Sequence, residues 1–257
     1  MKIQLLSDLH IEFWARQGIK EQDKLKEFQT DAEVLVLAGD INVGRRNTLE
    51  TLKYFSDMYP HVVYVRGNHE EYGSRRDVFL EVETFEDKLP DNVHFLEDTS
   101  VTIGRIVFIG SPLWTDFHGD PLAEQAASFG IADFHRVNTL KTSDYIFANE
   151  IAKASINMHY GLNSGKHKVI VTHFVPAMEC VHPRWKQPGD LVLNKYFANN
   201  LGKYIAELSD TTWMFGHTHD SCDMLIGDTR MLCNPHGYLG YEQCANFNPT
   251  RTYDVLS

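Results

Sequence analysis

The 257-residue chain lacks several features that mark special classes of protein. No apolar run approaches the roughly 20 residues needed to span a bilayer, so we expect no membrane segment. Its start already carries Asp8, His10 and Glu12, which is unlike a secretory signal peptide. It has only four cysteines, at positions 180, 222, 233 and 244, with no Cys-x-x-Cys pair among them. This pattern favours reduced thiols and a cytoplasmic location over a disulfide framework or a structural zinc site.

Positive charge is also scarce. The chain has 24 lysines and arginines against 35 aspartates and glutamates, which gives a formal charge of −11. Proteins that bind long nucleic acids use clustered basic residues to neutralise phosphates, and the sequence shows no such track. A small anionic ligand is still compatible with this charge, provided that its site supplies positive charge locally.

Short apolar runs rich in β-branched residues alternate with helical stretches. No repeat or linker interrupts them, so we expect a single domain over residues 1–257. Five runs that end in polar residues predict buried strands: Lys2–Leu6, Val34–Ala38, His61–Val65, Lys168–Val171 and Thr211–Phe215. Four stretches predict helices: Thr48–Met58, Arg75–Lys88, Ser143–Tyr160 and Asn194–Leu208. With a tail of short strands and turns over Met224–Val255, this pattern predicts an α/β fold, a layered α/β/β/α sandwich of two mixed sheets.

Polar side chains that can bind metal follow each of the five predicted strands. Ligands gather beyond the carboxyl ends of strands in such sheets. Asp8 and His10 are two residues apart, as are His217 and His219, so each pair would face one side of an extended segment. The whole set suits zinc, manganese or iron: Asp8, His10, Asp40, Asn68, His69, His173, His217 and His219.

Each motif alone carries little weight. A lone Asp-x-His or Gly-Asp is common, and any one of the 13 histidines could be a surface or hydrogen-bonded residue. Gly-Asn-His-Glu and Gly-His-x-His are more specific. Gly39, Gly67 and Gly216 stand directly before motif residues, where a tight turn or a close backbone approach would need them. The decisive feature is that all five motifs occur in order, each at a predicted strand end.

In this order the motifs resemble those of the calcineurin-like metallophosphoesterase superfamily. They span residues 8–219, and the later segment 234–238, Asn-Pro-His-Gly-Tyr, is similar to a turn found after the last ligands in many members. The resemblance implies two divalent ions, manganese, iron or zinc, which activate a shared water for attack on phosphorus. It implies that one ion is held by Asp8, His10, Asp40 and His219. The other would be held by Asp40, which bridges the two, and by Asn68, His173 and His217.

The same resemblance implies a catalytic role for His69. It would lie just outside the ions and donate a proton or a hydrogen bond to the leaving oxygen. The alternative is that His69 only orients Asn68. In the protein Ser/Thr phosphatases an aspartate three residues after the Gly-Asp motif orients this histidine, but this chain has Val43 there. The sequence therefore identifies no partner for His69.

Three further residues are candidates for substrate contact. Asn42 follows Asp40 by two positions and could point at the phosphate. His182 and Arg184 belong to a long loop, 173–189, that is aromatic and basic and could cover a nucleotide base. The alternative for this loop is a solvated surface segment with a packed tryptophan.

These features predict a metal-dependent phosphoric ester hydrolase. Gly-Asn-His-Glu with Gly-His-x-His resembles the diesterase branches of the superfamily, which favours a phosphodiesterase acting on nucleotide-type or other small phosphodiesters. A phosphomonoesterase or protein phosphatase is an alternative. An alternative from another class is an inactive binding scaffold of the same fold, but such a scaffold should have lost ligands, and all seven are present with His69.

Overall fold

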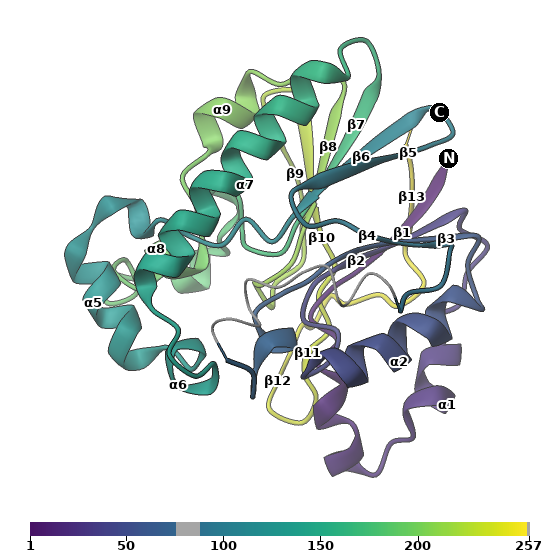
Figure 1. Ribbon diagram of the computed structural model, residues 1–257, viewed down its shortest axis with the longest axis horizontal. Helices are drawn as coiled ribbons and strands as arrows, with labels where there is room; N and C mark the ends of the chain where they lie inside the picture. The colour runs from purple at the N-terminus through teal and green to yellow at the C-terminus, as the bar shows by residue number, and fades with distance from the viewer. Residues whose placement is uncertain (76–87, 256–257) are drawn as a thin grey trace.

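Two β-sheets pack face to face, and helices cover the outer face of each (Figure 1). The computed structural model describes residues 1–75 and 88–255. The first sheet has the order β13-β1-β2-β3-β4, formed by Thr252–Asp254, Lys2–Leu6, Val34–Ala38, His61–Val65 and Val93–Phe95. Strands β1 to β4 are parallel, and β13 pairs antiparallel with β1.

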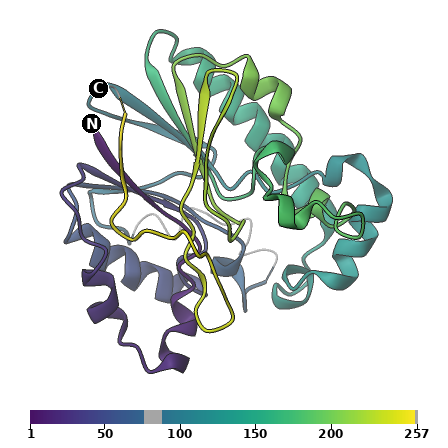
Figure 2. The same cartoon turned by 180° about the vertical axis from the view of Figure 1, so that it is seen from behind.

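The second sheet has the order β5-β6-β7-β8-β10-β9. Its strands are Thr99–Ile103, Ile106–Ser111, His167–Thr172, Thr211–Phe215, Thr229–Cys233 and Cys222–Ile226. The four central strands are parallel and the two edge strands are antiparallel. A small ribbon of β11 (Gly237–Tyr238) and β12 (Glu242–Gln243) follows β10. Figure 2 shows the chain returning from this ribbon to pair with β1.

The helices separate into two groups. Helices α1 (Glu21–Lys26) and α2 (Arg45–Ser56) lie on the first sheet. On the second sheet lie α7, Thr142–Leu162, and α9, Gly202–Ala206. Helices α5, α6 and α8, which span Pro121–Gly130, Asp133–Arg136 and Asn194–Phe197, lie beside the lower end of α7 in Figure 1. The predicted α/β/β/α sandwich of two mixed sheets is therefore confirmed.

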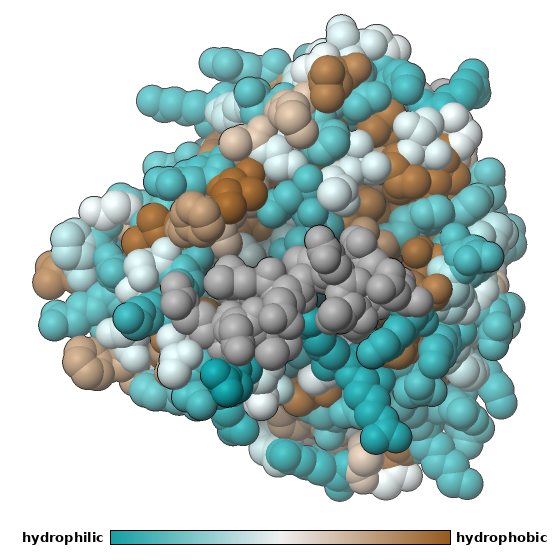
Figure 3. Space-filling model, viewed as in Figure 1, coloured by the Kyte–Doolittle hydropathy of each residue, from teal (hydrophilic) through white to brown (hydrophobic). Residues whose placement is uncertain are grey.

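Strand β2 shows why the layers form. Val34 and Val36 face the other sheet, whereas Leu35 and Leu37 face the helices, because successive side chains of a strand point to opposite faces. A parallel strand covered on both faces needs apolar residues at every position, and all five residues of β2 are buried. Most of the outer surface is hydrophilic, with apolar side chains in small separate groups on the face that Figure 3 shows. No helix in the described residues is long and apolar enough to cross a membrane.

The five predicted strands occur where the sequence placed them, and β7 is one residue longer at each end. Helices α2 and α7 match two predicted helices to within a few residues. The prediction for Arg75–Lys88 falls almost entirely outside the described residues. The single helix predicted over Asn194–Leu208 is wrong, because Ala198 forms a bridge with Val175 and the backbone N–H of Asn199 donates to Val175 O. This pairing divides the segment into α8 and α9.

Tight contact between the sheets generates the first prediction. Gly110 lies in β6, and a Cβ built on it would lie 2.3 Å from Leu96 Cβ and 3.0 Å from Val65 Cγ2. We expect Gly110→Ala to lower the free energy of unfolding by about 1–3 kcal/mol, since the packed neighbours must shift. The control is Gly161→Ala in α7, where a Cβ meets nothing within 4 Å and should raise stability by up to ~1 kcal/mol. Urea unfolding of both variants measures the difference, and equal stability would contradict the packing argument.

Candidate active site

Side chains from strand ends of both sheets converge on one spot. Asp8, His10 and His219 form one group, in which one carboxylate oxygen and one nitrogen of each ring lie within 4.8 Å of one another. Within it, His10 Nε2 is 3.3 Å from His219 Nε2, and His219 Nε2 is 3.8 Å from Asp8 Oδ1. The first two residues follow β1 and the third follows β8, so this group joins the two sheets.

A second group lies beside the first, and its carboxylate also approaches His10 of the first group. Asp40, His173 and His217 meet the same 4.8 Å criterion, and His217 Nδ1 is 3.1 Å from His173 Nε2. Asp40 Oδ2 is 3.5 Å from His173 Nε2 and 3.8 Å from His10 Nε2. The Asp40 carboxylate therefore stands between the two groups. Asn68 Oδ1 completes the second group, 3.0 Å from His173 Nε2.

The protonation pattern of these groups fits a cation. His173 Nδ1 donates to Ala38 O at 2.9 Å, and Asn68 Nδ2 donates to Asp133 Oδ1 at 2.8 Å. The remaining Nε2 of His173 and Oδ1 of Asn68 therefore face each other, together with the Asp40 carboxylate. Such converging acceptors need positive charge between them, either an extra proton or a metal ion. Without metal, burial lowers the pKa of His173, but the Asp40 carboxylate raises it to about 10, so the proton supplies the charge.

His10 also suits metal binding, but as a neutral ring. Burial and the nearby His69 lower the pKa of His10 to about 4, so its ring is neutral. Glu12 Oε1 lies 3.3 Å from His10 Nδ1 and can accept its hydrogen. The lone pair of Nε2 then faces the first group, as metal-binding histidines require.

The backbone at these residues is strained. Asp8, His10, Asp40 and His217 have φ of 51°, 46°, 52° and 65°, a left-handed region that costs a non-glycine residue about 1–3 kcal/mol. The prediction that the Asp-x-His pair lies on an extended segment is therefore wrong. The turns aim the side chains instead, and backbone bonds hold them: Asp8 N donates to Gly39 O at 3.0 Å, and His10 N donates to Asp40 O at 3.0 Å.

Glycines allow the ligand loops to touch, as the sequence predicts. A Cβ on Gly67 would lie 2.1 Å from Asp40 Oδ1, and a Cβ on Gly39 would lie 2.4 Å from His173 Nδ1. A Cβ on Gly216 would lie 2.5 Å from Ala38 O. A side chain at Gly39 or Gly216 would push loops of the two sheets apart, and one at Gly67 would displace the Asp40 carboxylate.

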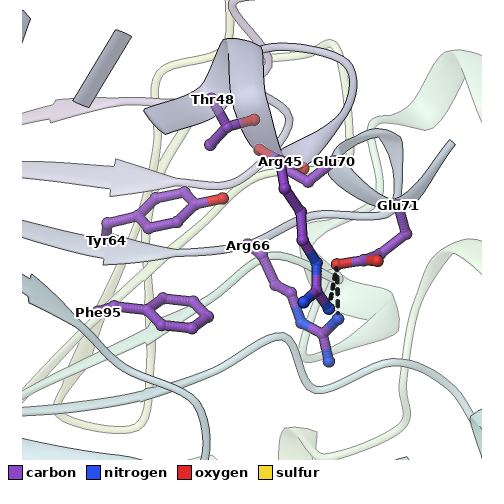
Figure 4. A pocket seen from close by; sticks show the side chains of 7 residues that line it. All are labelled: Arg45, Thr48, Tyr64, Arg66, Glu70, Glu71 and Phe95. Atoms are coloured by element: carbon purple, nitrogen blue, oxygen red, sulfur yellow. Dashed lines mark hydrogen bonds and ion pairs between the residues drawn. The ribbon is translucent and has the colours of Figure 1, made fainter. Parts of the chain in front are cut away.

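The Glu70 carboxylate holds the loop that carries Asp40 through backbone hydrogen bonds. It accepts backbone N–H bonds from Gly67 at 2.9 Å, Asp40 at 3.2 Å and Ile41 at 2.9 Å. Its neighbour Glu71 belongs to a buried charged cluster, shown in Figure 4, in which Arg66 Nη1 donates to Glu71 Oε1 at 2.8 Å. Both glutamates thus fix the loop after β3, Glu70 through backbone N–H groups and Glu71 through Arg66.

His69 has a partner that the sequence did not identify. Its Nδ1 lies 3.3 Å from Glu12 Oε1, and its Nε2 lies 3.2 Å from the Tyr238 hydroxyl and 3.9 Å from Asp40 Oδ2. Burial lowers the pKa of His69, but the carboxylates of Asp40 and Glu12 raise it to about 9. Glu12 lies in a short 3-10 turn, Ile11–Phe13, directly after His10. The only sequence signal was its position two residues beyond the Asp-x-His motif.

Asp133 is a second residue that the sequence gave no reason to choose. Its buried carboxylate accepts from Asn68 Nδ2 and from the hydroxyls of Tyr72 at 2.6 Å, Tyr145 at 2.8 Å and Tyr196. This cluster fixes the amide of Asn68 so that its oxygen faces His173. His69 makes none of these bonds to the Asn68 side chain.

The three substrate-contact candidates lie elsewhere. Asn42 is buried behind the Asp40 loop, where its Nδ2 donates to Thr51 Oγ1 at 3.2 Å and its Oδ1 accepts from Val43 N at 2.9 Å. His182 is exposed and accepts from the backbone N–H of Arg184. The Arg184 guanidinium donates to Asp220 at 2.9 Å and to Glu242 at 3.3 Å. The structure thus brings the metal-binding candidates and His69 together, and these three remain outside that cluster.

Comparison with known proteins agrees with this geometry. The family model for calcineurin-like phosphoesterase matches residues 1–221. The chain belongs to the calcineurin-like phosphoesterase family. A sequence search of curated proteins finds no match.

Solved structures share the calcineurin-like phosphoesterase fold with the chain. Phosphopantetheinyl hydrolase from Mycobacterium tuberculosis is 15% identical, with a TM-score of 0.70, over 92% of this chain and 89% of that one. A dimetal phosphatase from Danio rerio is 14% identical, with a TM-score of 0.51, over 93% and 88% of the two chains. Both likenesses concern the fold alone.

The support that Glu70 gives to the Asp40 loop generates the second prediction. In Glu70→Gln one acceptor oxygen becomes an NH2 group, so at least one buried N–H loses its acceptor, a loss of about 1–3 kcal/mol in the free energy of unfolding. Because the same loop carries Asp40, metal affinity should fall as well. Thermal unfolding with and without manganese measures both effects, with Glu50→Gln on the exposed face of α2 as the control. A variant as stable as the control would show that Glu70 is not the support.

Proposed function

We propose that the chain is a metal-dependent phosphodiesterase acting on nucleotide-type or other small phosphodiesters. The observation that carries the proposal is the pair of adjacent acceptor groups with the Asp40 carboxylate between them and His69 directly beside them. A pair of metal sites that share one ligand suits the clamping of phosphoryl oxygens. Membership of the phosphoesterase family supports hydrolysis of a phosphate ester.

The proposed ligand sets follow from the contacts. Asp8, His10 and His219, with Asp40, would hold one divalent ion. Asn68, His173 and His217, with Asp40, would hold the other. Such ions, when bound, neutralise phosphoryl oxygens and lower the pKa of a shared water. The chain itself fixes the orientation of the side chains that would bind metal. Asp133 holds the Asn68 amide, Ala38 O holds the His173 ring and Glu12 holds the His10 ring.

His69 is the proposed general acid. Glu12 on Nδ1 and Asp40 nearby stabilise its protonated form, and the Nε2 edge of the ring faces Asp40 and Tyr238. A protonated imidazole at this edge can donate to the leaving oxygen as its bond to phosphorus breaks. Glu12 thus takes the orienting role that the aspartate three residues after Gly-Asp has in the protein Ser/Thr phosphatases.

We also propose a location for the protein and weigh the alternative functions. All four cysteines are free in the structure, which supports a reducing compartment such as the cytoplasm. The complete ligand set argues against an inactive scaffold, and a phosphomonoesterase is the alternative that the next experiment separates.

Chelator-stripped protein should be inactive, and added manganese should restore hydrolysis of bis-p-nitrophenyl phosphate in preference to p-nitrophenyl phosphate. Asp40→Asn should lower this activity by several orders of magnitude and weaken metal retention, since Asp40 serves both groups. Release of p-nitrophenolate and metal content measure the two effects. Preference for the monoester would replace the diesterase with a phosphatase, and no turnover with any divalent metal would favour the inactive scaffold.

His69→Ala should retain both metals but lose rate mainly on esters with poor leaving groups, because a good leaving group needs no proton. The measurement is kcat for a series of aryl phosphodiesters of increasing phenol pKa, with metal content determined in parallel. Equal losses across the series would show that His69 is not the proton donor.

A further inference from the structure

A cavity of about 390 Å³ opens beside the two ligand groups. Part of its lining consists of residues from the two groups together with His69: Asp40, Asn68, His69, His217 and His219. A phosphate bound there would direct one of its substituents into the rest of the cavity. The volume falls within the range of small-molecule sites, so a substituent the size of an aromatic ring or larger fits.

Much of the remaining lining of the cavity is apolar or aromatic. It comes from two segments that lie far apart in sequence, residues 130–133 and residues 175–197. The apolar and aromatic side chains that line it are Ile131, Val175, Val181, Trp185, Leu193, Tyr196 and Phe197. Trp185, Leu193 and Phe197 are 40%, 37% and 37% exposed, so large hydrophobic side chains stand at the surface beside the proposed centre. Exposed apolar side chains gathered at one cavity are typical of a binding surface.

The described lining of this cavity carries histidines and carboxylates. Among the described residues that line it there is no lysine or arginine, whereas Asp133, Asp190 and Glu242 all contribute. Arg184 pairs with Asp220 and Glu242, and its guanidinium stacks 4.7 Å from the Trp185 ring centroid. The charge of Glu242 is therefore already balanced by Arg184.

We propose that this cavity selects a phosphodiester whose only negative charge is the phosphate in contact with the metals, and whose second substituent is aromatic or apolar and uncharged. The inference rests on the proposed function and adds the substrate class to it. A second phosphate or a carboxylate in the cavity would lose its water near Asp190, and the described lining residues include no lysine or arginine to replace that water. An uncharged ring would instead bury apolar surface against Leu193 and Phe197.

Three synthetic diesters test the proposal with the manganese-loaded protein. Each carries the same p-nitrophenolate leaving group, and the second substituent is methyl, phenyl or 4-carboxyphenyl. We expect kcat/KM to rise about tenfold from methyl to phenyl, from apolar burial. We expect it to fall at least tenfold from phenyl to 4-carboxyphenyl, because the added carboxylate has no counter-charge.

Two variants locate the effects in the cavity. Leu193→Ala should reduce the phenyl-to-methyl ratio severalfold, mainly through KM, whereas Leu225→Ala on β9, which is 64% exposed and lies outside the cavity lining, should leave that ratio unchanged. Asp190→Asn should raise relative activity on the 4-carboxyphenyl ester, and the matched control is Asp228→Asn in an exposed turn. Ratios between esters cancel any general effect of a variant on the metal centre.

The outcomes separate the inference from the proposed function. Hydrolysis of all three esters with equal kcat/KM, or a preference for the carboxylate, would overturn the charge selection and leave the phosphodiesterase standing. Ratios that do not change in Leu193→Ala or Asp190→Asn would show that another surface discriminates between the esters. No metal-dependent turnover of any ester would overturn the proposed function itself.

Discussion

The buried carboxylate of Asp40 is the constraint on which the rest of the structure depends. One oxygen accepts the backbone N–H of His69 at 2.9 Å, and the other faces the rings of His10 and His173 at 3.8 and 3.5 Å. Burial raises the pKa of Asp40, but His173 and His69 hold it well below its usual range. A buried ionised carboxylate is stable only with such partners, and the partners come from both sheets. The charge of Asp40 therefore holds residues of the two sheets together.

The strained backbone of the ligand loops persists because neighbouring segments hold it. The turn after β10 contributes most: His236 N donates to Ser7 O at 3.0 Å and Gly237 N donates to Asp8 O at 2.9 Å. The Asn234 amide in turn donates to Leu5 O at 2.8 Å. A segment that resembles a family motif thus ties the end of β10 to the end of β1. Strain of this kind is common at functional sites, where the surrounding structure fixes a conformation that a free loop would leave.

The sequence predicted the parts of the fold that local pattern determines. Strand β2 is apolar throughout and is followed by Gly39-Asp40, so both the strand and the candidate ligand after it could be predicted from a few residues. Glu12 and Asp133 could not, because each acts on a residue 57 or 65 positions away and carries no motif of its own. The break between α8 and α9 depends likewise on pairing with Val175, which only the tertiary structure reveals.

The distribution of charge explains how an acidic chain can act on an anion. A chain of −11 repels phosphate at long range, but salt screens that repulsion beyond about 8 Å, whereas contact with two divalent ions is hardly screened. In the proposed site two such ions against Asp8 and Asp40 would leave about two positive charges at one point. Among its described residues the cavity beside it adds no lysine or arginine, and its protonated His69 lies beside Asp40. Attraction for an anion would then be concentrated at the ions and His69, so a single phosphate would be oriented for attack and a second anionic group would lie near Asp190 without a lysine or arginine from the described lining.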